Sequence, residues 1–148
     1  ASLLCVPGMG DKKYVVRNDL LRTVAPMPVF AGEKNFNPHY LIIKLSRQYR
    51  FHPVNQCFCL VEYQPDGMTA NIWKQYVNSP RSFAELRRAI MEVPGLTWQY
   101  QLKNIVHYCS SSQIAGNKNY IRESPKKLLT ALCTPAGWML TGYIRRKA

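Results

Sequence analysis

The stretch QCFCLVEYQPDGMTANIWKQYV, residues 56–77, decides the fold that the sequence predicts. Two runs rich in aromatic and β-branched residues, 56–63 and 68–77, flank the tetrapeptide Gln64-Pro65-Asp66-Gly67. In this tetrapeptide proline presets a turn and glycine accepts a positive φ. The sequence therefore predicts two antiparallel strands joined as a β-hairpin.

The segments on either side of this hairpin predict one strand and one helix. Residues 40–45 alternate at the two-residue period of a strand, with Leu41, Ile43 and Leu45 on one face. After the hairpin, Ser82 followed three residues later by Glu85 is the pattern of a capping box, and residues 93–95, Val-Pro-Gly, end the predicted helix.

The rest of the chain predicts three further strands and a second helix. Residues 96–108 and 113–121 are rich in strand formers, and three serines, residues 110–112, lie between them as a turn. Ser124-Pro125 opens a helix that Pro135 and Gly137 end, and residues 138–144 form a last short strand. The buried stripe of this helix is expected to be Leu128, Leu129, Leu132 and Cys133.

The predicted order is β-β-β-α-β-β-α-β, which indicates an α+β fold. We expect a single mostly antiparallel sheet with the two helices packed on one face. Residues 1–38 are rich in proline and glycine and are expected to form an extended basic N-terminal arm, with a short helix only at 18–24. Residues 39–148 are expected to form the core domain, with a basic C-terminal tail.

The chain is strongly basic, with 20 Lys and Arg against 8 Asp and Glu among 148 residues and a formal net charge of +12. Such a charge predicts a polyanionic partner. RNA is favoured over DNA because no helix-turn-helix, zinc finger or basic recognition helix is present. A membrane surface is less favoured, because no segment gathers its charge opposite bulky apolar residues, and no apolar run approaches the ~20 residues that cross a bilayer.

Phosphate contacts are expected from the basic residues of the two termini and of the segment around residue 47, with stacking on bases from Trp73, Tyr76 and Tyr143. The predicted RNA-binding residues are Lys12, Lys13, Arg17, Arg22, Lys44, Arg47, Arg50, Lys74, Arg145, Arg146 and Lys147.

Five cysteines, an odd number, favour a reducing compartment over a secreted disulfide framework. A metal site would use Cys57, Cys59, Cys109 and Cys133 with His52 or His107, but buried thiols are the favoured interpretation. His107 and Cys109 share one face of the predicted strand and form the alternative of a thiol nucleophile with its base. We expect no cofactor, no metal and no enzymatic activity, because too few acidic residues are present to complete a catalytic set.

Several short motifs resemble those of one protein family. They are Pro38-His39-Tyr40-Leu41-Ile42, His52-Pro53-Val54, the run 68–74, Gln113-Ile114-Ala115-Gly116, and the helix at 124–133 ended by Ala136-Gly137-Trp138. Together they resemble the mitochondrial large-ribosomal-subunit protein family forty-nine, whose fold is similar to that of translation initiation factor one. The resemblance implies a location in the mitochondrial matrix, a presequence removed before Ala1, no enzymatic activity, and ribosomal RNA and neighbouring ribosomal proteins as partners.

The leading hypothesis from the sequence is a non-catalytic RNA-binding structural component of a ribonucleoprotein, namely the mitochondrial ribosome large subunit. Two alternatives remain open: an accessory subunit of a mitochondrial membrane-associated complex, and a Cys/His-dependent enzyme. Removal of the initiator methionine explains Ala1 as well as cleavage of a presequence does, so a cytoplasmic location remains the alternative. No small-molecule substrate is expected.

Overall fold

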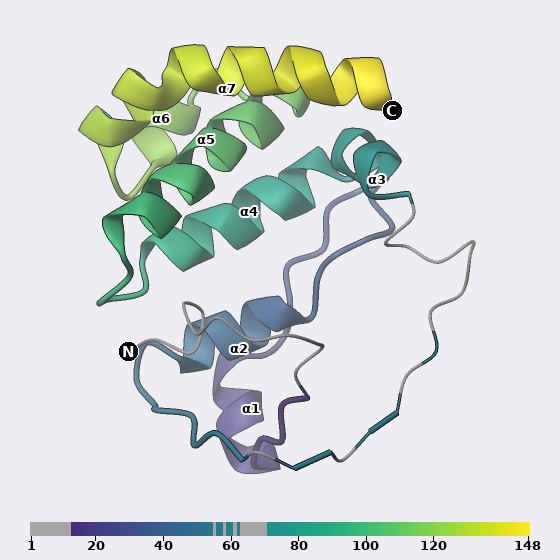
Figure 1. Cartoon of the computed structure of the whole chain (residues 1–148), viewed down its shortest axis with the longest axis vertical. Coiled ribbons are helices and arrows are strands. Elements are labelled where there is room, and N and C mark those ends of the chain that lie inside the picture. Colours follow the sequence, from purple (N-terminus) through teal and green to yellow (C-terminus); the bar gives the residue numbers. More distant parts are fainter. Residues whose placement is uncertain (1–12, 55, 58, 61, 63–70) are drawn as a thin grey trace.

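The computed structural model describes residues 13–54, 56–57, 59–60, 62 and 71–148, and within these ranges the regular structure is entirely helical (Figure 1). The seven helices of the described residues are α1 (Asn18–Val24), α2 (His39–Leu45), α3 (Ile72–Asn78), α4 (Pro80–Met91), α5 (Trp98–Ile114), α6 (Tyr120–Glu123) and α7 (Lys127–Lys147).

The prediction of an α+β fold with a mostly antiparallel sheet is therefore wrong, and so is the fold that the family resemblance implied. The second strand of the predicted hairpin contains α3, and the described residues of the first strand form no strand. The predicted turn at 64–67 lies outside the described residues. A short apolar run fits a helix as well as a strand, and tertiary contacts decide between them. Tyr76 is buried, and its ring lies 4.3 Å from that of Phe83 on α4.

The strand predicted at 40–45 is also a helix, α2. Tyr40 and Ile43, three residues apart, are the buried positions that pack against Leu86, Ala89 and Ile90 of α4. Because nearly every residue of this segment is apolar, its alternation does not distinguish a period of 2.0 from one of 3.6.

Residues 96–121, predicted as two strands, form mainly the long helix α5. The serines at 110–112, predicted as a turn, lie inside this helix and are almost completely buried. Serine favours turns when it is exposed, but here Ser110 packs against α7, where its hydroxyl lies 3.0 Å from that of Thr141.

The helix predicted from Ser124 does not stop at Pro135 or Gly137, because α7 continues to Lys147. The strand predicted at 138–144 is therefore wrong. A Cβ atom on Gly137 would lie 2.5 Å from Cβ of Cys109, so this glycine permits the close approach of α5 and α7. Its role is packing, whereas the sequence pattern was interpreted as a helix end.

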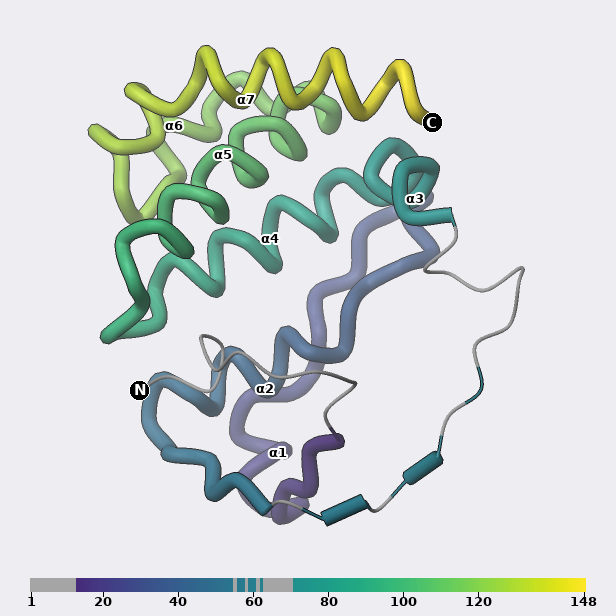
Figure 2. The backbone as a smooth tube through the Cα atoms, in the orientation of Figure 1, coloured from purple at the N-terminus to yellow at the C-terminus, as the bar shows by residue number. Residues whose placement is uncertain are grey.

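The helices α4, α5 and α7 stack in succession, α3 lies beside the C-terminal end of α7, and α1 and α2 lie on the other side of α4 (Figure 2). One buried cluster joins α2 to α4 around Tyr40, Ile43 and Ile90. A second joins α4, α5 and α6 around Met91, Ile105 and Tyr120. The core thus lies between helix layers, and α7 forms one outer layer of the molecule.

Two local predictions are confirmed. A short helix occupies Asn18–Val24, and the helix before residues 93–95 ends at Met91, with Gly95 at a φ of +73°. The capping box is wrong, however, because the carboxylate of Glu33 caps α4. It accepts hydrogen bonds from the backbone N–H of Arg81 and of Ser82, both at 2.8 Å. The division of the chain at residue 38 stays a prediction.

Candidate functional site

The basic residues predicted to bind RNA lie in separate places, and those of α2 serve internal contacts. The Arg47 guanidinium is 2.6 Å from the Glu92 carboxylate and donates a second bond, at 3.3 Å, to the carbonyl of Ala89. The Lys44 ammonium lies 5.2 Å from the centre of the Tyr40 ring. Arg47, just after α2, thus joins this segment to α4, whereas the Lys44 contact lies within α2. Arg50 is exposed beyond the helix.

The predicted residues around α1 form a second group. Lys13 and Arg22 are exposed, and Arg17 pairs with Asp19 at 2.7 Å. Lys12 lies outside the described residues. An exposed pair of this kind contributes little to stability, so Arg17 remains free to exchange its partner for another anion.

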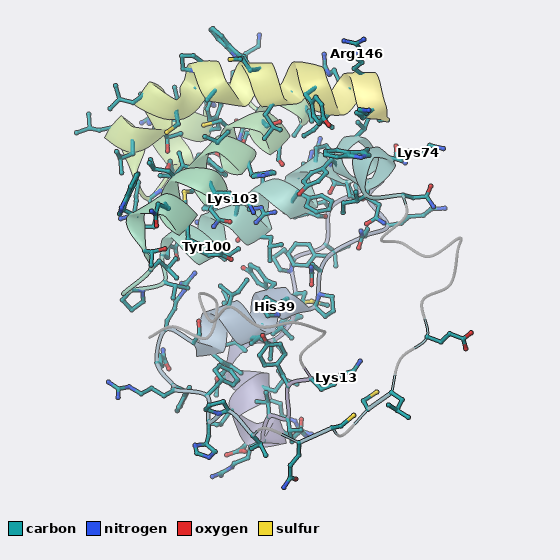
Figure 3. All side chains as sticks on the ribbon, viewed as in Figure 1. Lys13, His39, Lys74, Tyr100, Lys103 and Arg146 are labelled. Atoms are coloured by element: carbon teal, nitrogen blue, oxygen red, sulfur yellow. The ribbon has the colours of Figure 1, made fainter. Side chains whose placement is uncertain are left out.

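The third group of predicted residues is brought together by the fold. Lys74 on α3 and the C-terminal residues of α7 occupy the end where these two helices meet (Figure 3). All are exposed, and no salt bridge recorded within the described ranges involves them. The members of this basic end are Lys74, Arg145, Arg146 and Lys147.

The aromatic side chains predicted to stack on bases do not form a platform. No sheet exists in the described part of the chain, and Tyr76 is buried between Phe83 and His107. Trp73 meets Tyr143 edge to face, with ring centroids 5.4 Å apart. This contact joins α3 to α7 next to the basic end.

His107 and Cys109 do not form a catalytic pair, because both lie on α5. Two residues along a helix correspond to a rotation of about 200° around its axis, so the two side chains lie on nearly opposite sides. Cys109 is fully buried and its thiol faces the carbonyl of Thr130 at 3.6 Å. Burial raises the pKa of this thiol to about 11, so it is protonated at neutral pH. Burial, with the nearby charges of Arg87 and Lys103, lowers the pKa of His107 to about 4.

The metal alternative gains no geometric support either. Cys57 and Cys59 are exposed and distant in sequence from the buried Cys109. Within the ranges that the structure describes, no three histidine, cysteine or acidic side chains gather to hold a metal ion.

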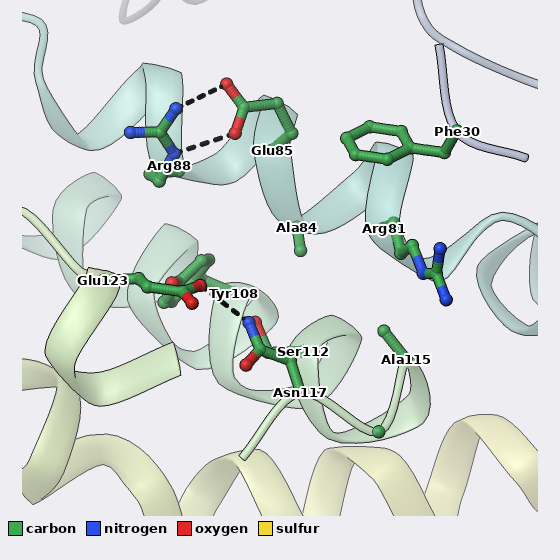
Figure 4. A pocket seen from close by; sticks show the side chains of 11 residues that line it. Phe30, Arg81, Ala84, Glu85, Arg88, Tyr108, Ser112, Ala115, Asn117 and Glu123 are labelled. Atoms are coloured by element: carbon green, nitrogen blue, oxygen red, sulfur yellow. Dashed lines mark hydrogen bonds and ion pairs between the residues drawn. The ribbon is translucent and has the colours of Figure 1, made fainter. Parts of the chain in front are cut away.

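A cavity of about 380 Å³ lies between α4 and α5 near Phe30 (Figure 4). Both of its carboxylates are hydrogen-bonded: Arg88 forms two bonds of 2.8 Å with Glu85, and Asn117 donates to Glu123 at 2.8 Å. Burial raises the pKa of the Tyr108 phenol, which lines the cavity, to about 12. The Tyr108 phenol is therefore protonated at neutral pH and is not a nucleophile.

The outward side of α7 is the most unusual surface of the described structure. From residue 128 to residue 143, every exposed position of this helix carries an apolar residue or glycine. Leu128, Leu132 and Met139 are 83%, 77% and 79% exposed, and Trp138 is 64% exposed. We call this surface the outer face of α7, made of Leu128, Leu129, Ala131, Leu132, Pro135, Ala136, Trp138, Met139, Gly142 and Tyr143.

The outer face contradicts one expectation from the sequence. Leu128, Leu129 and Leu132, predicted as part of a buried stripe, are exposed. The exposed apolar face with basic charge at both ends of the helix was not predicted. The available signal was the run 128–144, which has no charged residue and is flanked by Lys126-Lys127 and by Arg145-Arg146-Lys147. Ending the predicted helix at Pro135 divided this run.

Comparison with known proteins gives no relative: no family model matches, and no curated protein or solved structure is significantly similar to the chain. The resemblance to ribosomal family forty-nine therefore stays a prediction. In the part of the chain that the structure describes, α7 and the other helices are too short or too polar to cross a membrane.

Proposed function

We propose that the protein is a non-catalytic structural subunit of a larger, membrane-associated assembly. The outer face of α7 carries this proposal, because soluble monomers rarely expose a contiguous apolar surface of this kind unless a partner covers it. Its bulky members, Leu132, Trp138 and Met139, are more than half exposed while the opposite side of the same helix is packed. The face is therefore suited to contact with another component.

The absence of a catalytic role is supported by the separation of the reactive side chains. His107 and Cys109 point to different sides of α5, and both carboxylates of the cavity near Phe30 are hydrogen-bonded. A subunit that acts by occupying a place in an assembly needs surfaces for its neighbours and no convergent acid, base and nucleophile.

A second candidate is the ribonucleoprotein component that the charge of +12 predicts. The observation that favours it is the basic end, where Lys74, Arg145 and Arg146 are exposed without an ion-pair partner among the described residues. Binding to ribosomal RNA beside neighbouring ribosomal proteins in the mitochondrial matrix would use this end. RNA, however, would leave the outer face of α7 uncovered, so this candidate comes second.

Sedimentation of the native protein from a gently solubilised cell extract tests both candidates. We expect a fast-sedimenting particle that withstands ribonuclease and that pellets with membranes when detergent is omitted. Release of the protein by ribonuclease would overturn the membrane-associated proposal in favour of the ribonucleoprotein. Slow sedimentation under every condition would contradict both.

A further inference from the structure

We infer that the outer face of α7 lies flat on an anionic lipid surface, an inference that rests on the proposed function and names the partner of that face. The first argument is the orientation of the helix. Ordinary surface helices turn their apolar side to the core and their polar side to water. In α7 most of the bulky apolar side chains lie instead on the exposed side.

The inward side of α7 carries hydroxyl groups and glycine beside one fully buried apolar residue, Ile144. Thr141 Oγ1 lies 3.0 Å from Ser110 Oγ and 3.1 Å from Gln113 Oε1. Near the other end of the helix, Thr130 Oγ1 lies 2.6 Å from Ser124 Oγ. Because the polar groups of α7 are satisfied against α5 and its neighbours, its apolar side chains are left for an external apolar phase.

The ends of α7 supply charge complementarity to anionic headgroups. Lys126 and Lys127 precede the outer face, Arg145, Arg146 and Lys147 follow it, and residues 126–147 contain no acid. Juxtaposed basic residues near an anionic bilayer are attracted to its surface potential. The 21 residues of α7 span roughly 32 Å, so both basic clusters can reach headgroups while the apolar face between them enters the acyl boundary.

The composition of the face favours lipid over a protein partner. Protein interfaces combine apolar contacts with about one hydrogen bond per 100–200 Å², which gives them specificity. The exposed positions from 128 to 143 offer only two polar side-chain atoms, the indole N–H of Trp138 and the phenol of Tyr143. Tryptophan and tyrosine are the residues that gather at the level of the headgroups.

Flotation of the purified full-length protein with lipid vesicles tests this inference. One set of vesicles is phosphatidylcholine alone, and the other is phosphatidylcholine mixed with phosphatidylglycerol. We expect binding to the mixed vesicles and its loss at high salt. Leu132→Ser or Met139→Ser should each weaken binding about tenfold, because a bulky apolar side chain leaves the acyl region. The matched control is Val29→Ser, which removes an apolar side chain that is 90% exposed outside α7.

A second readout places the bound lipid at the helix itself. In a Trp73→Phe, Trp98→Phe background, Trp138 is the remaining tryptophan. Its emission should shift to shorter wavelength with the mixed vesicles and should be quenched by brominated acyl chains. An unshifted spectrum with bound vesicles would overturn the inference, since the protein would then be held by another surface.

The outcomes separate this inference from the proposed function. Equal binding of wild type and the α7 variants, or no binding to either vesicle, overturns the lipid contact. If the native protein nevertheless sediments in a large ribonuclease-resistant particle, the proposed function stands and a protein covers the face. If vesicles bind as expected but the native protein sediments slowly, the lipid contact stands and the subunit role fails.

Discussion

Gly137 is the residue on which the contact between α5 and α7 depends. We predict that Gly137→Ala destabilises the protein by about 1–3 kcal/mol, because the added Cβ would overlap Cβ of Cys109 and the helices would have to separate. Gly142→Ala is the matched control on the same helix, since nothing lies within 4 Å of its added Cβ. It should leave stability unchanged or raise it by up to about 1 kcal/mol through better helix propensity. Urea unfolding measures both, and equal effects would contradict the packing described.

His107 gives the folded state a pH dependence with a defined sign. Its pKa is lowered to about 4 in the folded protein against 6.5 for the free side chain, so the unfolded chain binds more protons between these values. Stability should therefore be highest above about pH 6.5 and should fall as the pH drops towards 4. Burial also lowers the pKa of His39, which adds to the same trend.

Substitution of His107 measures its contribution to the pH dependence of folding stability. His107→Gln should flatten the loss of melting temperature between pH 6.5 and 4, and the remaining slope should include the part due to His39. Melting followed by circular dichroism across this range measures the difference. A variant whose pH profile matches that of wild type would show that His107 is not buried as described.

At the scale of the elements, α4 is stabilised at its beginning by Glu33 from a distant part of the sequence. We predict that Glu33→Ala costs about 1–2 kcal/mol, the range for losing a helix cap together with an anion at the positive end of the helix. Glu33→Gln keeps an acceptor oxygen and should cost less. Chemical denaturation measures the two variants, and no loss in either would mean that α4 does not depend on this cap.

Because the leucines of α7 are exposed, substituting them should change the unfolding free energy little, whereas a buried leucine stripe would predict a large loss. Leu132→Ser, at a position 77% exposed, should change the unfolding free energy by less than about 0.5 kcal/mol. Ile144→Ala, at a fully buried position of the same helix, should cost about 2–4 kcal/mol. Unfolding of the isolated protein in urea compares them. A large loss for Leu132→Ser with a small loss for Ile144→Ala would mean that α7 is turned the other way.

The sequence predicted the short helix at Asn18–Val24, and it predicted the end of α4, where Pro94 and Gly95 act locally. It failed where a segment is apolar on nearly all sides, as in α2, because the period is then ambiguous. It also failed where small residues serve packing: Gly137 and the serines at 110–112 were interpreted as breaks, yet all are buried inside helices, and Gly137 closely approaches Cys109 and Ser110. Such a role depends on a partner helix that local sequence does not reveal.

The basic end and the outer face of α7 were predicted only in part, because both depend on contacts between segments distant in sequence. Lys74, Arg145 and Arg146, predicted to bind RNA, are exposed, and α3 and α7 bring them to one end; their binding to RNA stays a prediction. Arg47 was selected too, but it pairs with Glu92, which is 45 residues away in the sequence, and no local pattern predicts that contact. The outer face of α7 was missed because an exposed apolar side is recognised only when the packed side of the helix is known.

At the scale of the whole molecule, the protein combines a net charge of +12 with an uncovered apolar helix face. Each feature alone has an ordinary explanation, since basic charge aids solubility and single exposed leucines are common. Together, on one outer layer with basic residues at both ends, they describe a component whose surface is completed by a partner.

Hydroxyl-radical footprinting of the native assembly tests this claim most directly, because oxidation of tryptophan and methionine can be read peptide by peptide. Trp138 and Met139 are compared between the isolated protein and the assembly, with Trp98, which is 66% exposed on α5, as the reference. The account predicts that Trp138 and Met139 react readily in the isolated protein and are protected in the assembly. Equal oxidation of both residues in the two states would contradict it.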